Sequence, residues 1–357
     1  MSAPFLKNSL QHNIRQALQL EGGFAELVTR GHESEDIQIE LQFRLEIAEV
    51  ERLVTYQLTI GMDNDRPVVR REILRYKRSA YGAPFHFLDF RNGQGYAITN
   101  EEDFNKPDED LEREEQALES PDILAVKGLG QFQRFKAANA FRQLIENWHV
   151  SDFHITDARG RKEAGYAEHL SSSGDNLPLV TQFIFERHPK EWETIVRKMR
   201  QRVPGIERIE AKSTEDGFLI LRFQDGAFEA PFLDRYVSDG TVKMLAYLVL
   251  LHDPNPHPLL CVEEPENQLY AQLLGELAEE FRAYSSRAQG GGQVLVTTHS
   301  PDFLNAVRLE EVFWLEKQKG ISHIHRASDD AQLTALVAEG DHLGELWRQK
   351  LFKGANL

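Results

Sequence analysis

Two short apolar segments that end abruptly in polar residues constrain the fold most strongly. The first is LLCVEEPENQLY at 259–270, and the second is QVLVTTHSPDFL at 293–304. Such apolar runs predict strands that are buried on both faces, as in a parallel sheet. Helical patterns at 240–252 and 267–285 alternate with these strands and with another strand expected at 311–316. We therefore predict an α/β fold with a parallel sheet in this part of the chain.

The residues that follow these two strands are suited to a magnesium–nucleotide site. Ligands of α/β sheets gather at the carboxyl ends of the strands. Glu263 and Glu264 follow the first strand, where one carboxylate can orient the metal through water and the other can activate a water. An ordinary helix N-terminus is the competing interpretation. His299 follows the second strand and is expected at the same sheet edge, with a capping or core histidine as the alternative.

A third segment, RYVSDGTVKMLAYLVLL at 235–251, places Ser238, Asp239, Gly240 and Thr241 before an apolar helix. Free backbone N–H groups at a helix N-terminus form an anion site, and glycine allows a close approach. A plain helix cap by serine or aspartate is the alternative.

The rest of the chain predicts two further regions. A helix at 7–20 precedes alternating segments at 37–47 and 54–60, a third run at 68–76, and short apolar runs at 85–90 and 95–98, which together indicate an antiparallel β region. Helices are expected at 129–147, 177–187 and 190–203, and two strands at 206–223. We predict one domain over 1–357: the helix and β subdomain at 1–125, a mainly helical subdomain at 126–205, and the α/β core at 206–357.

The net charge of −16 is distributed unevenly. Residues 101–120 hold ten acidic residues against Lys106 and Arg113, and we expect a solvated loop there. The overall charge excludes a broadly basic nucleic-acid binder. Two basic segments, Arg66–Arg78 and Arg197–Arg202, leave open a local contact with DNA or an acidic partner, although a solvated strand face and a solvated helix are the alternatives.

Other features exclude several classes of protein. No apolar run reaches the roughly 18 residues of a membrane span, and the start of the chain lacks the apolar region of a secretory signal. Cys261 is the only cysteine, so an internal disulfide and a cysteine-based zinc site are excluded. We expect a cytoplasmic protein. No heptad repeat supports a long coiled-coil scaffold.

The order and spacing of SDGT, EEPEN and TTHSP resemble the C-terminal half of ABC-type ATPases, in the branch with SMC, RecF and OLD-type proteins. The resemblance is closest to bacterial AAA-type ATPases that carry LSDGT, EEPEN and TTHSP. It extends from about Gly22 to the end, is weakest between 60 and 165, and includes HLGELWRQKLFKG at 342–354. It implies a P-loop NTPase-like ABC head that binds ATP and Mg²⁺ at a head-to-tail dimer interface, in DNA maintenance or phage defence.

The resemblance also implies roles for the matched residues. Glu264 corresponds to the catalytic glutamate that polarises the attacking water, and Glu263 takes the Walker B position, where many relatives have aspartate. His299 matches the histidine that senses the γ-phosphate. Ser238 and Gly240, within the segment from Ser238 to Thr241, match the signature residues that contact ATP held by the opposite subunit. Relatives often have LHP after the acidic pair, whereas this chain has Leu269-Tyr270-Ala271.

The phosphate-binding loop of the family, GxxxxGK[ST], does not occur in the 357 residues. In relatives this loop lies near the N-terminus, so we expect that about 35–45 residues, with the loop and two strands, would precede Met1, leaving an exposed apolar sheet edge in their absence. Two hypotheses follow. The full protein is an ATPase dimer, or this chain is a non-catalytic regulatory subunit that supplies its signature to a partner ATPase.

Three other hypotheses are weaker. OLD-type relatives append a nuclease domain, but only 58 residues follow His299, so a nuclease would be a separate effector protein. His323 and His325 share one strand face and could bind a metal, but solvent-facing histidines explain them better. A long-armed scaffold is disfavoured because heptads are absent.

Overall fold

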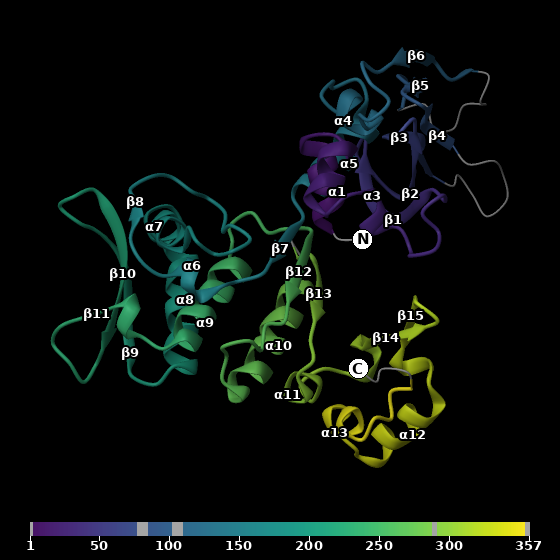
Figure 1. Cartoon of the computed structure of the whole chain (residues 1–357). Helices are drawn as coiled ribbons and strands as arrows, with labels where there is room; N and C mark the ends of the chain where they lie inside the picture. The colour runs from purple at the N-terminus through teal and green to yellow at the C-terminus, as the bar shows by residue number, and fades with distance from the viewer. Residues whose placement is uncertain (1–2, 77–84, 102–109, 288–290, 354–357) are drawn as a thin grey trace. The chain divides into compact units, whose positions relative to one another are not determined.

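The computed structural model describes residues 3–76, 85–101, 110–287 and 291–353. The chain forms two compact units, Met1–Trp148 and His149–Leu357, called here the N-terminal and C-terminal units (Figure 1). Together they contain a parallel sheet, antiparallel sheets and helices, which confirms the predicted α/β class. None of the described helices is long and apolar enough to span a membrane.

A six-stranded antiparallel sheet in the order β1-β2-β3-β4-β5-β6 forms the N-terminal unit. The strands are β1 Ile37–Ile47, β2 Val50–Asp63, β3 Arg66–Tyr76, β4 Phe85–Arg91, β5 Gln94–Ile98 and β6 Arg113–Ala117. The predicted strands at 37–47, 54–60, 68–76, 85–90 and 95–98 lie within the first five. The side chains of β1 and β2 alternate between the two faces of the sheet, and one row of apolar residues from each strand lies in the core.

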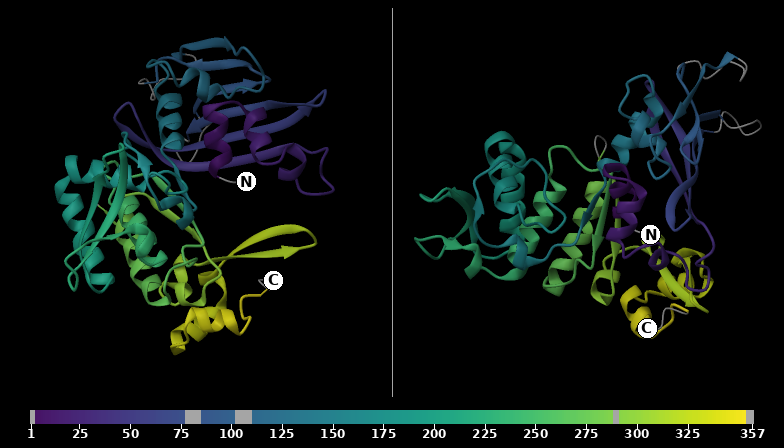
Figure 2. Two further views of the ribbon diagram at one scale, coloured as in Figure 1. Left: turned by 60° about the vertical axis from the view of Figure 1, so that its left-hand side comes forward. Right: turned by 45° about the horizontal axis from the view of Figure 1, so that its top comes forward.

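Helices cover one face of this sheet (Figure 2). They are α1 Ala3–Gln11, α2 Ile14–Leu20, α3 Phe24–Leu27, α4 Ala125–Leu129 and α5 Lys136–Glu146. The single helix predicted at 7–20 is wrong, because Asn13 begins a new helix by accepting a hydrogen bond from the Gln16 amide at 2.9 Å. Phe141 of α5 lies in the core with its ring centroid 4.4 Å from that of Tyr56.

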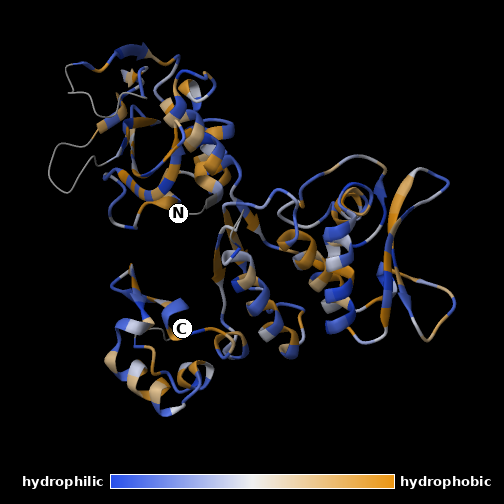
Figure 3. Ribbon diagram, turned by 180° about the vertical axis from the view of Figure 1, so that it is seen from behind, coloured by the Kyte–Doolittle hydropathy of each residue, from blue (hydrophilic) through white to orange (hydrophobic). Residues whose placement is uncertain are grey.

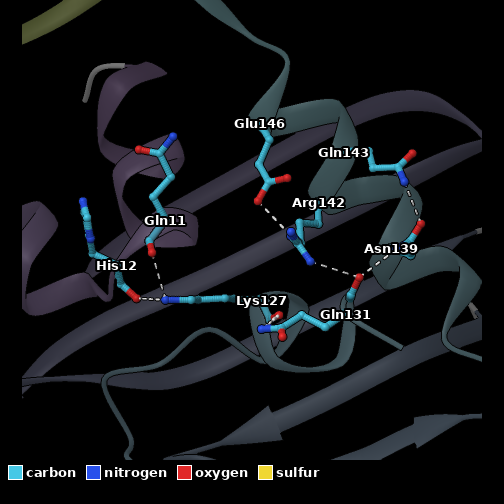
Figure 4. Close-up of polar contacts among 9 residues, drawn as sticks. Gln11, His12, Lys127, Gln131, Asn139, Arg142, Gln143 and Glu146 are labelled. Carbon is cyan, nitrogen blue, oxygen red and sulfur yellow. Dashed lines mark hydrogen bonds and ion pairs between the residues drawn. The ribbon is translucent and has the colours of Figure 1, made fainter. Parts of the chain in front are cut away.

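Polar contacts connect these helices at the rim of the N-terminal unit (Figure 4). The Lys127 ammonium donates to the carbonyls of Gln11, at 3.1 Å, and His12, at the C-terminal end of α1. A cation is favoured there by the helix dipole, and burial lowers the pKa of Lys127. Arg142 and Asn139 of α5 both donate to the carbonyl of Gly130, at 3.4 and 2.7 Å, so α4 and α5 are joined at their connection.

The prediction of a solvated loop over 101–120 is wrong for residues 113–117 and for Glu101. Arg113–Ala117 forms the edge strand β6 against β5, and charged residues suit a sheet edge. Glu101 is buried, and its carboxylate accepts a hydrogen bond from the Ala137 amide at 2.7 Å. Burial raises the pKa of Glu101 to about 8. Residues 102–109 lie outside the described residues.

Two cations of the predicted basic face at 66–78, Arg70 and Arg71, make contacts within the chain. Arg71 makes two hydrogen bonds to Asp89, at 3.2 and 2.9 Å. Arg70 lies 3.8 Å from Asp36. Glu72, the residue after Arg71, is fully buried. Its carboxylate accepts hydrogen bonds from the Val126 amide and the Tyr56 hydroxyl, both at 3.1 Å. Lys77 and Arg78 lie outside the described residues.

The C-terminal unit is built around α9, Asp239–Leu251, whose residues from Gly240 to Leu251 are all buried. The helix is apolar around its circumference (Figure 3), as expected for a helix in the centre of a unit. A three-stranded parallel sheet, β13-β12-β7, lies in the same unit and core. Its strands are β7 His149–Ser151, β12 Leu259–Glu263 and β13 Gln293–Thr297.

Further elements surround this core. The helices are α6 Ile155–Ala158, α7 Leu177–Arg187, α8 Pro189–Arg202, α10 Ala271–Ser285, α11 Pro301–Leu304, α12 Ala331–Glu339 and α13 Leu343–Arg348, with short 3-10 helices at Asp234–Tyr236, Leu309–Glu311 and Ala327–Asp329. A second sheet pairs β10 Phe218–Asp225 with β8 Lys162–Glu163, β9 Ile206–Ser213 and β11 Phe232–Leu233. The mainly helical subdomain predicted at 126–205 is divided between the two units. Helices α4 and α5 belong to the N-terminal unit, and α7 and α8 belong to the C-terminal unit.

The strand expected at 311–316 does not join the parallel sheet. It forms β14, Phe313–Gln318, which pairs antiparallel with β15, Ile321–Arg326, as a separate hairpin. Lys319 and Gly320 of the two-residue turn both have positive φ, which a tight hairpin requires. His325 of β15 stacks on Trp314 and contacts Glu316 at 3.0 Å, whereas His323 is exposed, so the two histidines form no metal site in the described residues.

Candidate functional site

The carboxyl ends of β12 and β13 bring the predicted acidic and histidine residues together. In the parallel register, Glu263 lies opposite Thr297, so both strands end at the same level. Glu264 leaves the strand with a φ of +39°, and its amide donates to the Thr297 carbonyl at 2.9 Å. The Nε2 atom of His299 lies 3.9 Å from Oε1 of Glu264. Both side chains are accessible, with 46% of Glu264 and 61% of His299 exposed.

The Glu263 carboxylate is exposed at the end of β12. No hydrogen bond or ion pair among the described residues engages it, so its oxygens are available to a hydrated cation. Mg²⁺ binds through one or two carboxylates and keeps several waters. Glu263, with Glu264 beside it, therefore fits a magnesium ion in its chemistry.

Glu266 is a residue of this site that the sequence reasoning missed. Its Oε1 atom accepts hydrogen bonds from the Thr298 hydroxyl and the His299 amide, both at 2.8 Å. The carboxylate therefore joins the turn after β12 to the end of β13 and sets the position of the His299 backbone. The signal was present as the third acidic residue of EEPEN, but the partners of Glu266 depend on the course of the turn.

Asn267 and Lys243 connect the glutamate turn to the helix of the SDGT segment. Asn267 donates from Nδ2 to Oε2 of Glu264 at 2.9 Å. Lys243, on α9, is buried and donates from Nζ to the Asn267 carbonyl at 2.7 Å. Burial lowers the pKa of Lys243, while Asp152, Glu266 and Glu264 oppose this effect. A continuous series of contacts thus extends from α9 through Asn267 and Glu264 to His299.

The SDGT segment forms the N-terminus of α9. Ser238 is the exposed N-cap, and its Oγ accepts from the Thr241 amide at 3.2 Å, so the capping interpretation holds for this residue. Gly240 is buried against the turn after β12, where an added Cβ would meet the Tyr270 ring at 3.2 Å and the Gln268 carbonyl at 3.3 Å. The close approach of these two segments therefore favours glycine, because a larger residue would push the turn away by a few tenths of an ångström.

Arg159 holds this N-terminus from a second side and was not identified in the sequence. Its guanidinium donates to the carbonyls of Asp234 at 3.1 Å and Val237 at 2.7 Å, and it pairs with the Asp239 carboxylate. Only 19% of the Arg159 side chain is exposed, whereas 54% of Asp239 is exposed. The described structure thus fixes the backbone of the SDGT segment while leaving Ser238 and Asp239 at the surface.

The second predicted basic segment, at 197–202, is only partly a solvated helix face. Lys198 and Arg202 of α8 both pair with the buried Glu280 of α10. Arg200 donates to the Glu207 carbonyl at 2.7 Å. Arg197 and Arg200 are the exposed cations of this segment.

A search of curated proteins gave no match. The fold is similar to the SMC head domain from Thermotoga maritima, at 12% identity over 76% of this chain and 74% of that chain, with a TM-score of 0.33. It is also similar to a chain from a study of "ATP-driven dimerization and DNA stimulated activation of SMC ATPases", at 14% identity over 42% of this chain and 92% of that chain, with a TM-score of 0.30.

A protein-family model described as "AAA domain, putative AbiEii toxin, Type IV TA system" matches residues 29–305. The match begins before β1 and ends after His299, so it includes both the antiparallel sheet and the strand ends that hold Glu263 and Glu264. This confirms the AAA-type ATPase family predicted from SDGT, EEPEN and TTHSP. The chain belongs to this family of AAA ATPase domains.

Proposed function

We propose that the carboxyl edge of β12 and β13 is the hydrolytic side of an ATP site that works with Mg²⁺. The observation that supports this most directly is the 3.9 Å separation of His299 Nε2 and Glu264 Oε1, at strand ends that also present Glu263. A histidine and a carboxylate at this separation can face a water and a phosphate oxygen together.

Each side chain would have a distinct role. Glu264 is held at Oε2 by Asn267, which leaves Oε1 directed towards His299 to accept the proton of the attacking water. His299 would donate from Nε2 to a γ-phosphate oxygen. Glu263 would hold the bound Mg²⁺ through its water shell, and that ion would neutralise charge on the phosphates.

We further propose that ATP is bound between two subunits in a head-to-tail dimer. Ser238 and Asp239 are exposed at the N-terminus of α9, where backbone N–H groups favour a phosphate. They would contact ATP held by the opposite subunit. The contacts from Lys243 through Asn267 to Glu264 would then connect the state of one site to the signature segment presented to the other.

A regulatory role in trans is the second candidate. The 357 residues contain no GxxxxGK[ST] segment, so a complete phosphate cradle needs that loop from another source. In this role the chain would present the SDGT segment, with Ser238 at its surface, to a partner ATPase and would not hydrolyse ATP alone. The family description names a type IV toxin–antitoxin system, which favours a defence setting over DNA maintenance. A DNA contact through residues 66–78 is a weaker proposal, since Arg70 and Arg71 already pair within the chain.

Measurement of ATP binding and turnover distinguishes the two roles. If the chain is an ATPase, Mg²⁺-dependent turnover is expected, and Glu264→Gln should lower kcat by about 10²–10⁴-fold while ATP still binds. Glu279→Gln, an exposed acid on α10, is the matched control and should leave kcat unchanged. Binding without turnover in the wild type, with stimulation of a partner ATPase that is lost in Ser238→Arg, would favour the trans role instead.

A further inference from the structure

A group of histidines and one aspartate lies at the amino end of β12, outside the proposed nucleotide site. His169, Asp253 and His257 place one potential ligand atom each within 4.8 Å of one another. His257 lies two residues before β12, whereas Glu263 and Glu264 are at its carboxyl end. The two groups of residues are therefore at opposite ends of the same strand.

The geometry of this group suits a small divalent cation. The Asp253 Oδ2 atom lies 2.8 Å from His169 Nδ1 and 3.9 Å from His257 Nε2. Tetrahedral Zn²⁺ with bonds of about 2.0–2.2 Å separates its ligands by about 3.4 Å. On binding, the distance from Asp253 to His169 must lengthen and the distance from Asp253 to His257 must shorten, each by about half an ångström, which side-chain rotation allows.

The surroundings hold the three side chains in place. Asn176 donates to the His169 carbonyl at 2.9 Å and accepts from the Ser171 amide at 2.8 Å, which fixes the backbone next to His169. The ring of His149 stacks on that of His257 with centroids 4.8 Å apart. These contacts orient the group in the way that outer partners orient metal ligands.

The charge of Asp253 also favours a cation. Its side chain is 2% exposed, and a buried carboxylate is costly unless it is paired. Among the described residues no lysine or arginine lies within 4.0 Å of it, and its polar contacts are His169, His257 and the Asn255 amide. His169 remains 44% exposed, so an ion has a route from solvent and an open coordination position.

We propose that His169, Asp253 and His257 form a binding site for Zn²⁺ or a chemically similar transition-metal ion. Two imidazoles and a carboxylate match the preferences of zinc, while Mg²⁺ and Ca²⁺ prefer oxygen ligands alone. The ion joins the segment after α9 to the 169–176 segment, so it would stabilise the C-terminal unit at the end away from Glu264.

The test is Zn²⁺ binding by the full chain prepared without a polyhistidine tag, measured by competition with a chromophoric chelator. One ion per chain is expected. His169→Ala should weaken Zn²⁺ binding by about 100-fold or more. Loss of a residue that only orients a metal ligand lowers metal affinity by about 10–100-fold, and loss of the ligand itself should lower it at least as much. His169 is partly exposed, so this variant is expected to fold; Asp253→Asn provides the second variant.

Two controls make the outcome specific. His154→Ala removes an exposed histidine that lies 3.3 Å from Asp152 without a third ligand, and His299→Ala removes the histidine at the opposite end of the sheet. Both should bind Zn²⁺ like the wild type. Absence of Zn²⁺ binding by the wild type, unchanged binding by His169→Ala, or loss of binding in His299→Ala would each overturn the proposal.

Discussion

Removal of Glu280 should destabilise the C-terminal unit strongly, because this single carboxylate compensates two cations. Lys198 and Arg202 both pair with it, and the exposed fractions of the Arg202 and Glu280 side chains are 8% and 6%. Removing one partner of a buried ion pair leaves an uncompensated charge and costs about 3–5 kcal/mol. We expect Glu280→Ala to reduce the free energy of unfolding of this unit by that amount.

Glu276→Ala is the matched control. Glu276 lies one turn earlier on α10 and contacts the same Arg202 at 3.4 Å, but its side chain is 50% exposed. An exposed ion pair contributes about 0–1 kcal/mol, so this variant should change stability little. The comparison separates burial of the pair from the mere presence of an acid beside Arg202.

Hydrogen exchange of peptides from α8 and α10 is the appropriate measurement, because the chain has two units and a single unfolding curve would mix them. A loss of 3–5 kcal/mol corresponds to exchange about 100-fold to 4,000-fold faster in amides that open with the unit, at about 1.4 kcal/mol per factor of ten. Equal effects of Glu280→Ala and Glu276→Ala would refute the reasoning. A variant that also replaces Lys198 and Arg202 with methionine should recover part of the loss.

Three further predictions concern both units. Phe141→Ala should destabilise the N-terminal unit by about 3–5 kcal/mol, measured by calorimetry, because the ring is fully packed. Burial raises the pKa of Glu72 from 4.5 to about 7. The folded unit therefore binds more protons than the unfolded chain between these pH values, and its free energy of unfolding should fall by about 3 kcal/mol as the pH rises through this range. The fall should be less steep in Glu72→Gln. Gly240→Val should lower ATP turnover or partner stimulation about tenfold or more, because its side chain would displace Tyr270 from the turn.

The sequence predicted elements whose side chains have a clear period. Strands β1 and β2 alternate regularly, and the ranges predicted for β1 to β5 were correct to within a few residues. Strand β6 was missed because all five of its residues except Ala117 are polar, and its main-chain pairing with β5 leaves no apolar pattern. Strand β14 was expected, but its partner was wrong, because pattern alone does not state which strand lies beside it.

The candidate site was predictable where residues follow strand ends directly. Glu263, Glu264 and His299 take their places from the parallel register of β12 and β13. Glu266 and Arg159 were missed because their partners lie 32–33 and 75–80 residues away and are set by tertiary contacts. Asn267 was missed because its contact with Glu264 depends on the course of the turn after β12. The buried ion pairs of α8 were likewise invisible, since a basic helix has the same sequence whether its cations face water or Glu280.

The turn after β12 explains why these missed residues matter for chemistry. Glu264 has a positive φ, as does Gln268, and a residue other than glycine in this region costs on the order of 1 kcal/mol. The cost is offset by the bonds of the turn: the Glu264 amide to Thr297, Asn267 to the Glu264 carboxylate, and Lys243 to the Asn267 carbonyl. An extended backbone at Glu264 would break these contacts. The strained turn therefore directs one carboxylate oxygen of Glu264 to His299 before any ligand binds, and the contact from Lys243 makes that geometry depend on the position of α9.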